Sequence, residues 1–487
     1  MTLDIDRFNY NWIGGQKVQL PETLDVRNPA DSSVVGRVPN AGADETAQAV
    51  DAAHSAFGTW SRMIPVERAQ FLHAWADNVL QRKDELAQLL SLEQGKPVSE
   101  AAGELAASVE FLRWYAEEGR RVYGEVIPPS RVGQRMLVLR QPVGVVGLIT
   151  PWNFPAAMVL RKMSPALAAG CTVVLKPAKQ TPLIAIALVE CLVETGISAG
   201  VVNLVTGDAA PISDTLLAHP SVRKISFTGS TEVGKSVMRR AADTVKKLSL
   251  ELGGNAPAIV FPDADLDQAA AAILDNKFEN CGQVCNGINV VYAHQAVADS
   301  LVQRLAEGAK RMVVGPGTTP GVQMGPLIDE NALNKVASLV SDAVAKGAVV
   351  HTGGHRLTAY RGGSFYAPTV LSGVTRAMAI AHEEVFGPVC PVLTFTSEAE
   401  VLHSSNDTPY GLAAYVFTRD IGRVYRVAEG LEVGMVAVNG TSLSFPQAPF
   451  GGIKESGQGR EGGHHGIEDY LETKFVSLTL TEGEEES

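Results

Sequence analysis

Apolar and polar positions follow different periods in different parts of the chain. The first hundred residues have a helical pattern, in which Leu72, Trp75 and Val79 are spaced for one helix face and Gly95 suits a helix end. These positions predict a helix that begins near Pro65 and a second helix over residues 99–118. Residues 124–141 are first rich in proline and then β-like, so we expect a protruding excursion there.

From residue 143 onward, short apolar runs alternate with helical stretches. The runs predict strands at 143–149, 172–175, 201–205, 224–227 and 247–252. The stretches between and after them predict helices at 156–169, 183–195, 210–218 and 232–242. Near-continuous apolar strands joined by helices are typical of a parallel sheet that is covered on both faces.

A second β/α set begins after Asn255. Its predicted strands lie near 258–261, 289–293, 391–395, 413–417 and 435–438, and its helices near 266–277, 296–311 and 330–346. Two α/β lobes that meet near residue 253 predict a cleft, where ligands usually bind. The final run, residues 469–480, has the pattern of a strand without a local partner. Such a strand must pair elsewhere or become an exposed edge, which indicates oligomerisation.

Composition narrows the class of protein. The 487 residues are 45% hydrophobic and 19% charged, and the net charge of −12 disfavours nucleic acid or an anionic membrane as a partner. Five scattered cysteines without a CxxC pair predict neither a disulfide framework nor a zinc site. The N-terminus lacks a secretory signal, and no apolar run is long enough to span a membrane. We therefore expect a cytoplasmic globular protein that holds no metal.

Two segments match known motifs in an unfavourable context. Residues 229–236, Gly-Ser-Thr-Glu-Val-Gly-Lys-Ser, fit the phosphate-loop pattern GxxxxGK[ST], which would imply a P-loop protein that binds nucleoside triphosphates. Against this, Glu232 would lie beside the triphosphate, and the loop follows the fourth strand of its set. A glycine-rich turn at a helix N-terminus can still hold the phosphates of a dinucleotide. Residues 196–200 fit GxSxG, but in the order helix, turn, strand, whereas the hydrolase elbow needs strand, turn, helix.

Four other motifs point together to one chemistry. They are Thr-Pro-Trp-Asn-Phe-Pro at 150–155, Leu-Glu-Leu-Gly-Gly-Asn at 250–255, Phe-Glu-Asn-Cys-Gly-Gln-Val-Cys-Asn at 278–286 and Glu-Glu-Val-Phe-Gly-Pro at 383–388. In this order they make the chain resemble the NAD(P)-dependent aldehyde dehydrogenase superfamily over essentially its whole length. Within the superfamily it is most similar to succinate-semialdehyde dehydrogenases, with lactaldehyde and other semialdehyde dehydrogenases close by.

The resemblance implies an α/β fold of the aldehyde dehydrogenase type. It would consist of two Rossmann-like α/β lobes plus a small β oligomerisation extension. Residues 1–122 and 143–253 would form the dinucleotide-binding domain and 254–453 the catalytic domain. Residues 123–142 and 469–487 would supply the oligomerisation strands and tail of a homodimer or homotetramer.

The resemblance also implies roles for three catalytic residues. Cys285 would attack the aldehyde as a thiolate, and the Asn153 amide and the Cys285 backbone N–H would stabilise the resulting oxyanion. Hydride transfer to the nicotinamide would then leave a thioester. Glu251 would be the general base that activates Cys285, the hydrolytic water, or both. Partial burial must raise the pKa of this carboxyl toward neutrality for that task.

A set of cofactor-binding residues follows from the same resemblance. They would contact the adenosine and its ribose, the pyrophosphate and the nicotinamide ribose. Lys176 would meet ribose hydroxyls, Gly229 and Ser230 the pyrophosphate, and Glu384 the nicotinamide ribose. The full set is Ile149, Trp152, Lys176, Pro177, Ala178, Lys179, Gly229, Ser230, Leu252, Glu384 and Phe386.

Lys179 departs from the pattern of relatives that prefer NAD. Those relatives usually carry a glutamate at this position, where it binds the 2′-hydroxyl of the adenosine ribose and would repel a 2′-phosphate. Lys179 removes the repulsion and supplies a cation. We therefore expect NADP to be preferred and NAD to be accepted, unless Lys179 points into solvent.

The substrate-binding residues leave two alternatives open. Enzymes similar to succinate-semialdehyde dehydrogenase clamp a distal carboxylate with an arginine and a serine, matched here by Arg161 and Ser444. Their second arginine is replaced by Glu279, which would repel a carboxylate unless it pairs with Arg161 or turns away. The substrate is therefore either an acidic semialdehyde or an uncharged, hydroxylated or aromatic aldehyde, with Phe154 and Phe445 as apolar walls.

Cys281 lies four residues before Cys285. We favour a packing role for Cys281. The alternative is a reversible disulfide that switches activity off.

Overall fold

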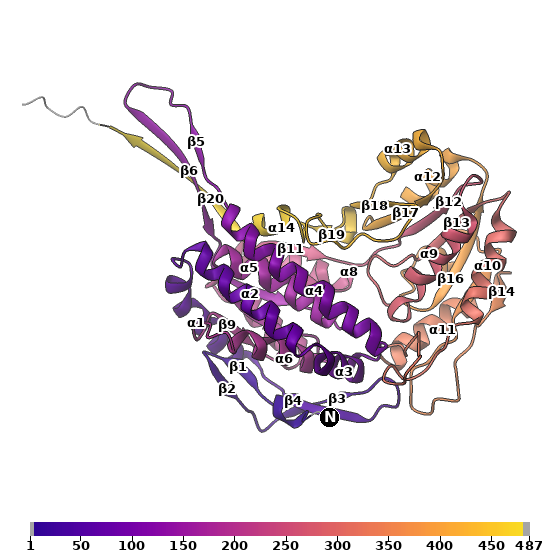
Figure 1. The fold of residues 1–487 in the computed structure, drawn as a ribbon, viewed down its shortest axis with the longest axis horizontal. Helices are drawn as coiled ribbons and strands as arrows, with labels where there is room; N and C mark the ends of the chain where they lie inside the picture. The colour runs from indigo at the N-terminus through magenta and orange to yellow at the C-terminus, as the bar shows by residue number, and fades with distance from the viewer. Residues whose placement is uncertain (1–3, 481–487) are drawn as a thin grey trace, which may run out of the picture.

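Two α/β units and a projecting β-arm make up the fold, which the computed structural model describes for residues 4–480 (Figure 1). The last seven residues of the predicted tail lie outside the described residues. No helix within residues 4–480 is both long and apolar enough to cross a membrane.

The first unit is built on an eight-stranded sheet. Its order is β19-β11-β10-β7-β8-β9-β1-β2, and the five strands from β11 to β9 run parallel, as predicted. The bounds are β1 Asn11–Ile13, β2 Gln16–Val18, β7 Val145–Ile149, β8 Thr172–Lys176, β9 Val202–Leu204, β10 Val222–Thr228, β11 Lys247–Glu251 and β19 Gly457–Gln458. The strand β19 comes from far along the chain and closes one edge antiparallel to β11.

Helices cover both faces of this sheet. Val146 and Leu148 of β7 pack into one core cluster, and Val145 and Ile149 into another, because successive strand residues point to opposite faces. Helices on the first face are α2 Pro65–Gln81, α3 Lys83–Gln94, α4 Val98–Glu118, α5 Pro155–Ala169 and α6 Pro182–Val193. Those on the second face are α1 Ala43–Trp60, α7 Ala209–Ala218 and α8 Thr231–Ala241.

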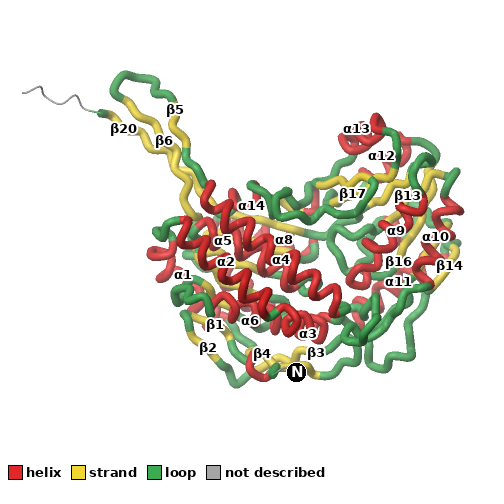
Figure 2. Tube along the Cα trace, in the orientation of Figure 1, coloured by secondary structure: helices red, strands yellow, loops and turns green. Residues whose placement is uncertain are grey.

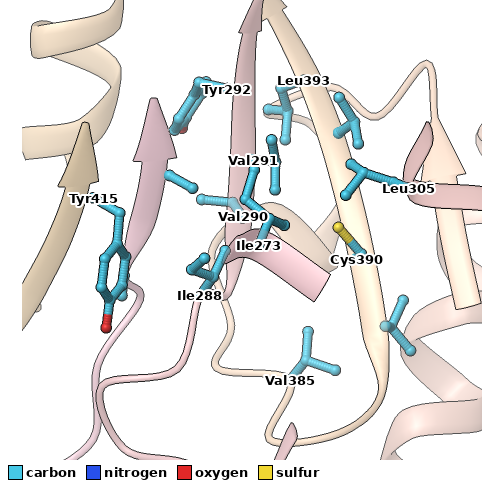
Figure 3. Packing of buried hydrophobic residues seen from close by; sticks show 14 of the residues in the cluster. Ile273, Ile288, Val290, Val291, Tyr292, Leu305, Val385, Cys390, Leu393 and Tyr415 are labelled. Carbon is cyan, nitrogen blue, oxygen red and sulfur yellow. The ribbon is translucent and has the colours of Figure 1, made fainter. Parts of the chain in front are cut away.

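The second unit is built on a seven-stranded sheet of order β14-β15-β16-β13-β12-β17-β18. The bounds are β12 Pro257–Val260, β13 Val290–His294, β14 Val349–Thr352, β15 Thr369–Ser372, β16 Val389–Phe395, β17 Ala413–Phe417 and β18 Met435–Val438. Its helices are α9 Leu266–Phe278, α10 Ala298–Lys310, α11 Glu330–Ala345, α12 Glu398–Asn406 and α13 Ile421–Gly430. Figure 3 shows Val291 of β13 and Leu393 of β16 packed in one core with Ile273 of α9.

The predicted excursion and the predicted terminal strand pair with each other. Strands β5 Glu125–Ile127, β6 Gln134–Pro142 and β20 Leu471–Thr479 form a sheet of order β20-β6-β5, which extends away from the helices of the first unit (Figure 2). Strand β20 runs antiparallel to β6 along its whole length. The terminal strand thus pairs with a distant segment and also forms one edge of this sheet, the two outcomes that the sequence left open.

The helical pattern predicted for the first hundred residues is wrong for residues 11–39. These residues form β1, β2, β3 Thr23–Arg27 and β4 Val34–Pro39. The strands are short, and Trp12 of β1 lies opposite Leu204 of β9. Only β1 pairs with a segment nearly two hundred residues away, whereas β2 pairs with β1 and β3 pairs with β4. In each case the cross-strand partner, and not the local period, sets the structure. The helix predicted from Pro65 and the helix predicted over 99–118 are confirmed as α2 and α4.

Candidate active site

Cys285 lies where two cavities meet. It follows α9 in the loop that leads to β13, and its side chain is half-buried. A cavity of about 270 Å³ opens on one side of the thiol and a second of about 610 Å³ on the other, and Cys285 lines both. The smaller cavity is lined by residues of both α/β units, as the predicted cleft requires. A thiol in this position can contact two ligands that enter from different directions.

The backbone before Cys285 is held in an unusual conformation. Asn280 and Cys281 have positive φ angles of 48° and 59°, and Gly282 has a φ of 74°. A Cβ on Gly282 would lie 2.2 Å from the carbonyl oxygen of Gly387, so only glycine fits at this approach. Strained backbone of this kind persists only where surrounding contacts over-determine it, and it is frequent at functional sites.

Glu251, at the end of β11, is buried beside Cys285. Among the described residues, neither of its carboxyl oxygens has a well-formed hydrogen-bond partner. Burial raises the pKa of Glu251 to about 7; Glu461 adds to the rise, while the Cys285 thiol and the cations of Lys162 and Arg161 oppose it. Burial, followed by the Glu251 charge, raises the pKa of Cys285 well above that of an ordinary thiol. A protonated thiol next to a carboxyl that titrates near neutrality is an arrangement for proton transfer.

Asn153 lines the same small cavity as Cys285 and Glu251. It follows β7 and is 6% exposed. Its side-chain amide donates a hydrogen bond of 3.0 Å to the Gln283 carbonyl. An amide has two N–H donors, so one remains available for a ligand. The structure thus brings the three predicted catalytic side chains to one cavity.

Most of the predicted cofactor residues also line the smaller cavity. Gly229 donates from its backbone to the Glu251 carbonyl at 3.1 Å, and a Cβ on Gly229 would lie 2.5 Å from the Phe227 ring. Ser230 caps the N-terminus of α8 by accepting a hydrogen bond from Val233. A helix N-terminus behind a bare glycine suits a phosphate group. Six of the predicted cofactor residues line the smaller cavity: Trp152, Gly229, Ser230, Leu252, Glu384 and Phe386.

Glu384 and Phe386 enter the cavity from the second unit. Gly254 donates its backbone N–H to the Glu384 carboxylate at 3.1 Å. Burial raises the pKa of Glu384 to about 6, and this hydrogen bond partly opposes the rise. The Phe386 ring meets the Trp152 ring edge-on, with centroids 5.6 Å apart. These contacts hold Glu384 and Phe386 in place at the cavity.

The remaining predicted cofactor residues lie at the adjoining strand ends, outside that cavity. Ile149 ends β7 and is buried, and Pro177 and Ala178 follow β8. Lys176 is also buried, and burial, reinforced by the Lys179 charge, lowers its pKa to about 8. Lys179 itself is 58% exposed, and its ammonium lies 3.8 Å from Asp208. It is therefore free to turn toward a nucleotide that binds at this edge.

The lysine of the phosphate-loop match at 229–236 is held by a carboxylate. The Lys235 ammonium pairs with Glu455 at 2.7 Å. Residues 196–200 lie between α6 and β9, a helix-to-strand connection as predicted. Within the part of the chain that the structure describes, no group of histidine, cysteine and carboxylate side chains could hold a metal ion.

The larger cavity contains all five predicted substrate residues. Arg161 of α5 is buried, and its guanidinium donates to the Ser444 hydroxyl at 2.5 Å. The guanidinium lies 4.6 Å and 4.7 Å from the ring centroids of Phe111 and Phe450. The other predicted members of the lining are Phe154, Glu279 and Phe445.

Glu279 lines this cavity but does not pair with Arg161. The charges that act on the Glu279 carboxyl are those of Lys96, Asp275 and Glu104, and Lys96 and Glu104 are buried. Desolvation raises the pKa of Glu279; Lys96 opposes this rise, and the carboxylates of Asp275 and Glu104 add to it. Two arrangements would reconcile Glu279 with an anionic substrate: an ion pair with Arg161, or a side chain that turns away. The ion pair is not formed.

Sequence reasoning missed a group of buried charges around the site. Lys162, next to Arg161 on α5, pairs with Glu461 at 2.5 Å and with the Ser226 hydroxyl at 3.2 Å. Glu461 also lies 3.9 Å from Arg161. No sequence signal marked Glu461, because it lies about three hundred residues beyond its partners. The ion pair of Lys96 and Glu104 was likewise missed.

Comparison with known proteins identifies the family. The model of the Aldehyde dehydrogenase family matches residues 15–476. Succinate-semialdehyde dehydrogenase (NADP(+)) GabD of Escherichia coli K12 is 49% identical over 459 residues, which cover 94% of this chain and 95% of that protein. The 3-sulfolactaldehyde dehydrogenase of Pseudomonas putida is 51% identical over 457 residues, which cover 94% of each. The crystal structure of succinate-semialdehyde dehydrogenase from Burkholderia pseudomallei has a TM-score of 0.95 and 47% identity, and the match covers 97% of this chain and 98% of that one. The protein belongs to the aldehyde dehydrogenase family.

Proposed function

We propose that this protein oxidises a semialdehyde, such as succinate semialdehyde, to the carboxylate, with NADP⁺ as preferred acceptor and NAD⁺ as accepted alternative. The observation that carries the proposal is the position of Cys285 between two cavities. One has the wall of a dinucleotide site, and the other contains the Arg161–Ser444 pair. The relatives named for succinate semialdehyde and 3-sulfolactaldehyde support an aldehyde that carries an anionic group.

The chemistry follows from the contacts of Cys285. Glu251 takes the thiol proton, and the thiolate attacks the aldehyde carbon to give a thiohemiacetal. The Asn153 amide and the Cys285 backbone N–H donate to its oxyanion. The nicotinamide, when bound, supplies the hydride acceptor. Loss of hydride leaves a thioester on Cys285. Glu251 releases the thiol proton to solvent and, ionised again, takes a proton from the water that attacks the thioester; cleavage of the C–S bond then releases the carboxylate product and restores the Cys285 thiolate.

The residues present fit the cofactor. The glycine at 229 and the capped N-terminus of α8 suit a pyrophosphate, and Glu384 can accept hydrogen bonds from ribose hydroxyls. Lys179 carries the proposed preference for NADP⁺, because its ammonium can pair with a 2′-phosphate. Its present neighbour, Asp208, is exposed and competes only weakly for it.

Arg161 makes an anionic substrate the better candidate. A buried guanidinium costs free energy unless it is paired, and Arg161 retains an unpartnered Nε among the described residues. A substrate carboxylate in the cavity could satisfy it. Glu279 favours the alternative, an uncharged, hydroxylated or aromatic aldehyde, because it brings a carboxylate to the same cavity.

The deciding experiment compares NADPH formation from succinate semialdehyde and from butanal, which has the same chain length but no carboxylate. A much higher kcat/KM for the acid supports the proposal. Equal or better use of butanal would overturn the substrate assignment in favour of the neutral alternative. Arg161→Met is the matched variant. It should lower kcat/KM for succinate semialdehyde and leave kcat/KM for butanal nearly unchanged.

We also propose a cytoplasmic homodimer or homotetramer assembled through the β-arm, the projecting sheet of β5, β6 and β20 with the residues next to it. The arm exposes large apolar side chains, which include Tyr123, Val126 and Phe475. Sheet edges and apolar groups that face solvent favour association with another copy. Sedimentation analysis of the full chain and of a chain that ends before β20 tests this assembly; a monomeric full chain would exclude it.

A further inference from the structure

A buried lysine that takes no part in the proposed chemistry lies behind the site. Lys96 lies in the loop between α3 and α4 and is 1% exposed. Its ammonium pairs with Glu104 of α4 at 2.6 Å, and the Glu104 side chain is also buried. Burying both charges is costly unless their geometry and additional hydrogen bonds compensate. The pair therefore needs a reason other than stability.

The additional hydrogen bonds of this pair all go to the turn that carries Asn153. Lys96 donates to the Asn153 carbonyl at 2.9 Å, and its ammonium lies 3.8 Å from the Phe154 ring centroid. Glu104 accepts from the backbone N–H groups of Ala156 and Ala157 at 2.9 Å and 3.0 Å. One ion pair thus holds the Asn153 backbone and the first turn of α5.

The same carbonyl also connects to the cysteine loop. Asn280 donates to the Asn153 carbonyl at 2.8 Å, and Gln94 donates to Asn280 at 2.8 Å. The Asn153 amide, in turn, donates to the carbonyl of Gln283, two residues before the nucleophile. The Asn153 backbone is therefore the junction between the Lys96–Glu104 pair and the loop that presents Cys285.

We propose that Lys96, through its ion pair with Glu104, is a positioning residue that holds the Asn153 amide at the distance an oxyanion requires. The inference rests on the proposed role of Asn153. A donor stabilises an oxyanion only when it is fixed before the reaction, and a misplacement of about 1 Å can cost about 100-fold in rate. Lys96 itself lines neither cavity, whereas its partner Glu104 and the neighbouring Phe154 line the larger one. The effect on the oxyanion that we assign to Lys96 passes through Asn153.

A double-mutant cycle tests the proposal. Lys96→Met removes the ammonium with little change in volume, and should lower kcat about 10- to 100-fold while KM for the aldehyde changes less than about threefold. Asn153→Ala should itself lower kcat about 100- to 1,000-fold. In the Asn153→Ala background, Lys96→Met should change kcat by less than about twofold, because its effect passes through the missing amide. Equal losses in both backgrounds, or no loss in the single variant, would overturn the proposal.

Controls separate positioning from damage to the fold. The alkylation rate of Cys285 by iodoacetamide should stay within about twofold of wild type, because thiol reactivity does not need the oxyanion donor; a comparable drop in alkylation would indicate a disordered site and overturn the proposal. Lys310→Met, at an exposed lysine on α10, controls for the substitution itself.

A second variant covers the case in which Lys96→Met does not fold. Glu104→Gln retains an oxygen for the α5 N–H groups but loses the ion pair, so it should give a smaller loss in kcat that is also absent without the Asn153 amide. A loss in kcat that persists when Glu104→Gln is combined with Asn153→Ala would count against the proposal. The cycle uses whichever aldehyde of a panel the wild type oxidises fastest. A wrong substrate assignment is then seen in the wild type, and the result on Lys96 stands apart from it.

Discussion

Glu251→Gln should lower the activity and raise the free energy of unfolding, and the size of the gain in stability follows from the burial of Glu251. The pKa of Glu251 is raised from 4.5 to about 7, chiefly by desolvation. Each pKa unit corresponds to 1.36 kcal/mol, so the folded protein disfavours the ionised form by about 3 kcal/mol. Glutamine has nearly the same shape and no charge to desolvate. The variant should therefore avoid most of this cost at any pH where Glu251 ionises.

The pH range follows from the two pKa values. Below about pH 4 the carboxyl is protonated in both the folded and the unfolded chain, and the substitution should change stability little. As the pH rises from 4.5 toward 7, the unfolded chain loses its proton first, so the wild type becomes less stable. Above about pH 8 the full difference, up to about 3 kcal/mol, should favour the variant.

Activity should change in the opposite direction. The wild-type kcat/KM should rise with pH through about 7, as Glu251 becomes the ionised base. Glu251→Gln should lower kcat about 100- to 10,000-fold and lose this acid limb.

Two measurements over the same pH series check both halves: NADPH formation with saturating cofactor, and thermal melting. Glu429→Gln, at an exposed carboxylate of α13, is the control for a general effect of charge. An acid limb that survives in Glu251→Gln, or a variant no more stable than wild type at about pH 8, would refute the reasoning.

Three further predictions concern single side chains at the edges of the site. Lys179→Glu should lower the NADP⁺ to NAD⁺ ratio of kcat/KM about 3- to 10-fold, because a carboxylate repels the 2′-phosphate in place of an exposed cation; an unchanged ratio would show that Lys179 faces solvent. Glu279→Arg should raise kcat/KM for succinate semialdehyde about tenfold and leave kcat/KM for butanal nearly unchanged, because it adds a cation to the cavity that Arg161 lines. Equal effects on both aldehydes would place residue 279 outside substrate contact. Cys281→Ala should lose activity to peroxide and regain it with dithiothreitol as the wild type does, because Cys281 is buried in the core and burial raises its pKa. Recovery by the wild type alone would reveal a disulfide switch.

Local pattern was sufficient wherever an element is set by its own residues. The strand at Val145–Ile149 and the helix at Pro155–Ala169 were predictable, because apolar runs, proline at the first turn and Gly170 at the end are local signals. The four ordered motifs likewise indicated the family and the cysteine chemistry, since the residues that matter lie within short stretches.

Long-range pairing set the limits of that reasoning. Strand β1 was missed because its partners come from β9 as well as β2. Strand β19 closes the first sheet from a segment two hundred residues beyond β11. Such pairings depend on which surfaces meet after the helices have packed, and no local period reports them.

The sequence by itself thus determined the helices and strands that local pattern sets, the parallel core of the first sheet and the motifs that contain the proposed reacting groups. Only the tertiary structure decided their environment: that Cys285 joins two cavities, that Glu251 titrates near neutrality, and that Lys96 is fixed to the Asn153 turn. The physical reason is that composition supplies a charge or a donor, whereas its desolvation and its partners arise from segments that are distant in the chain and meet only on folding.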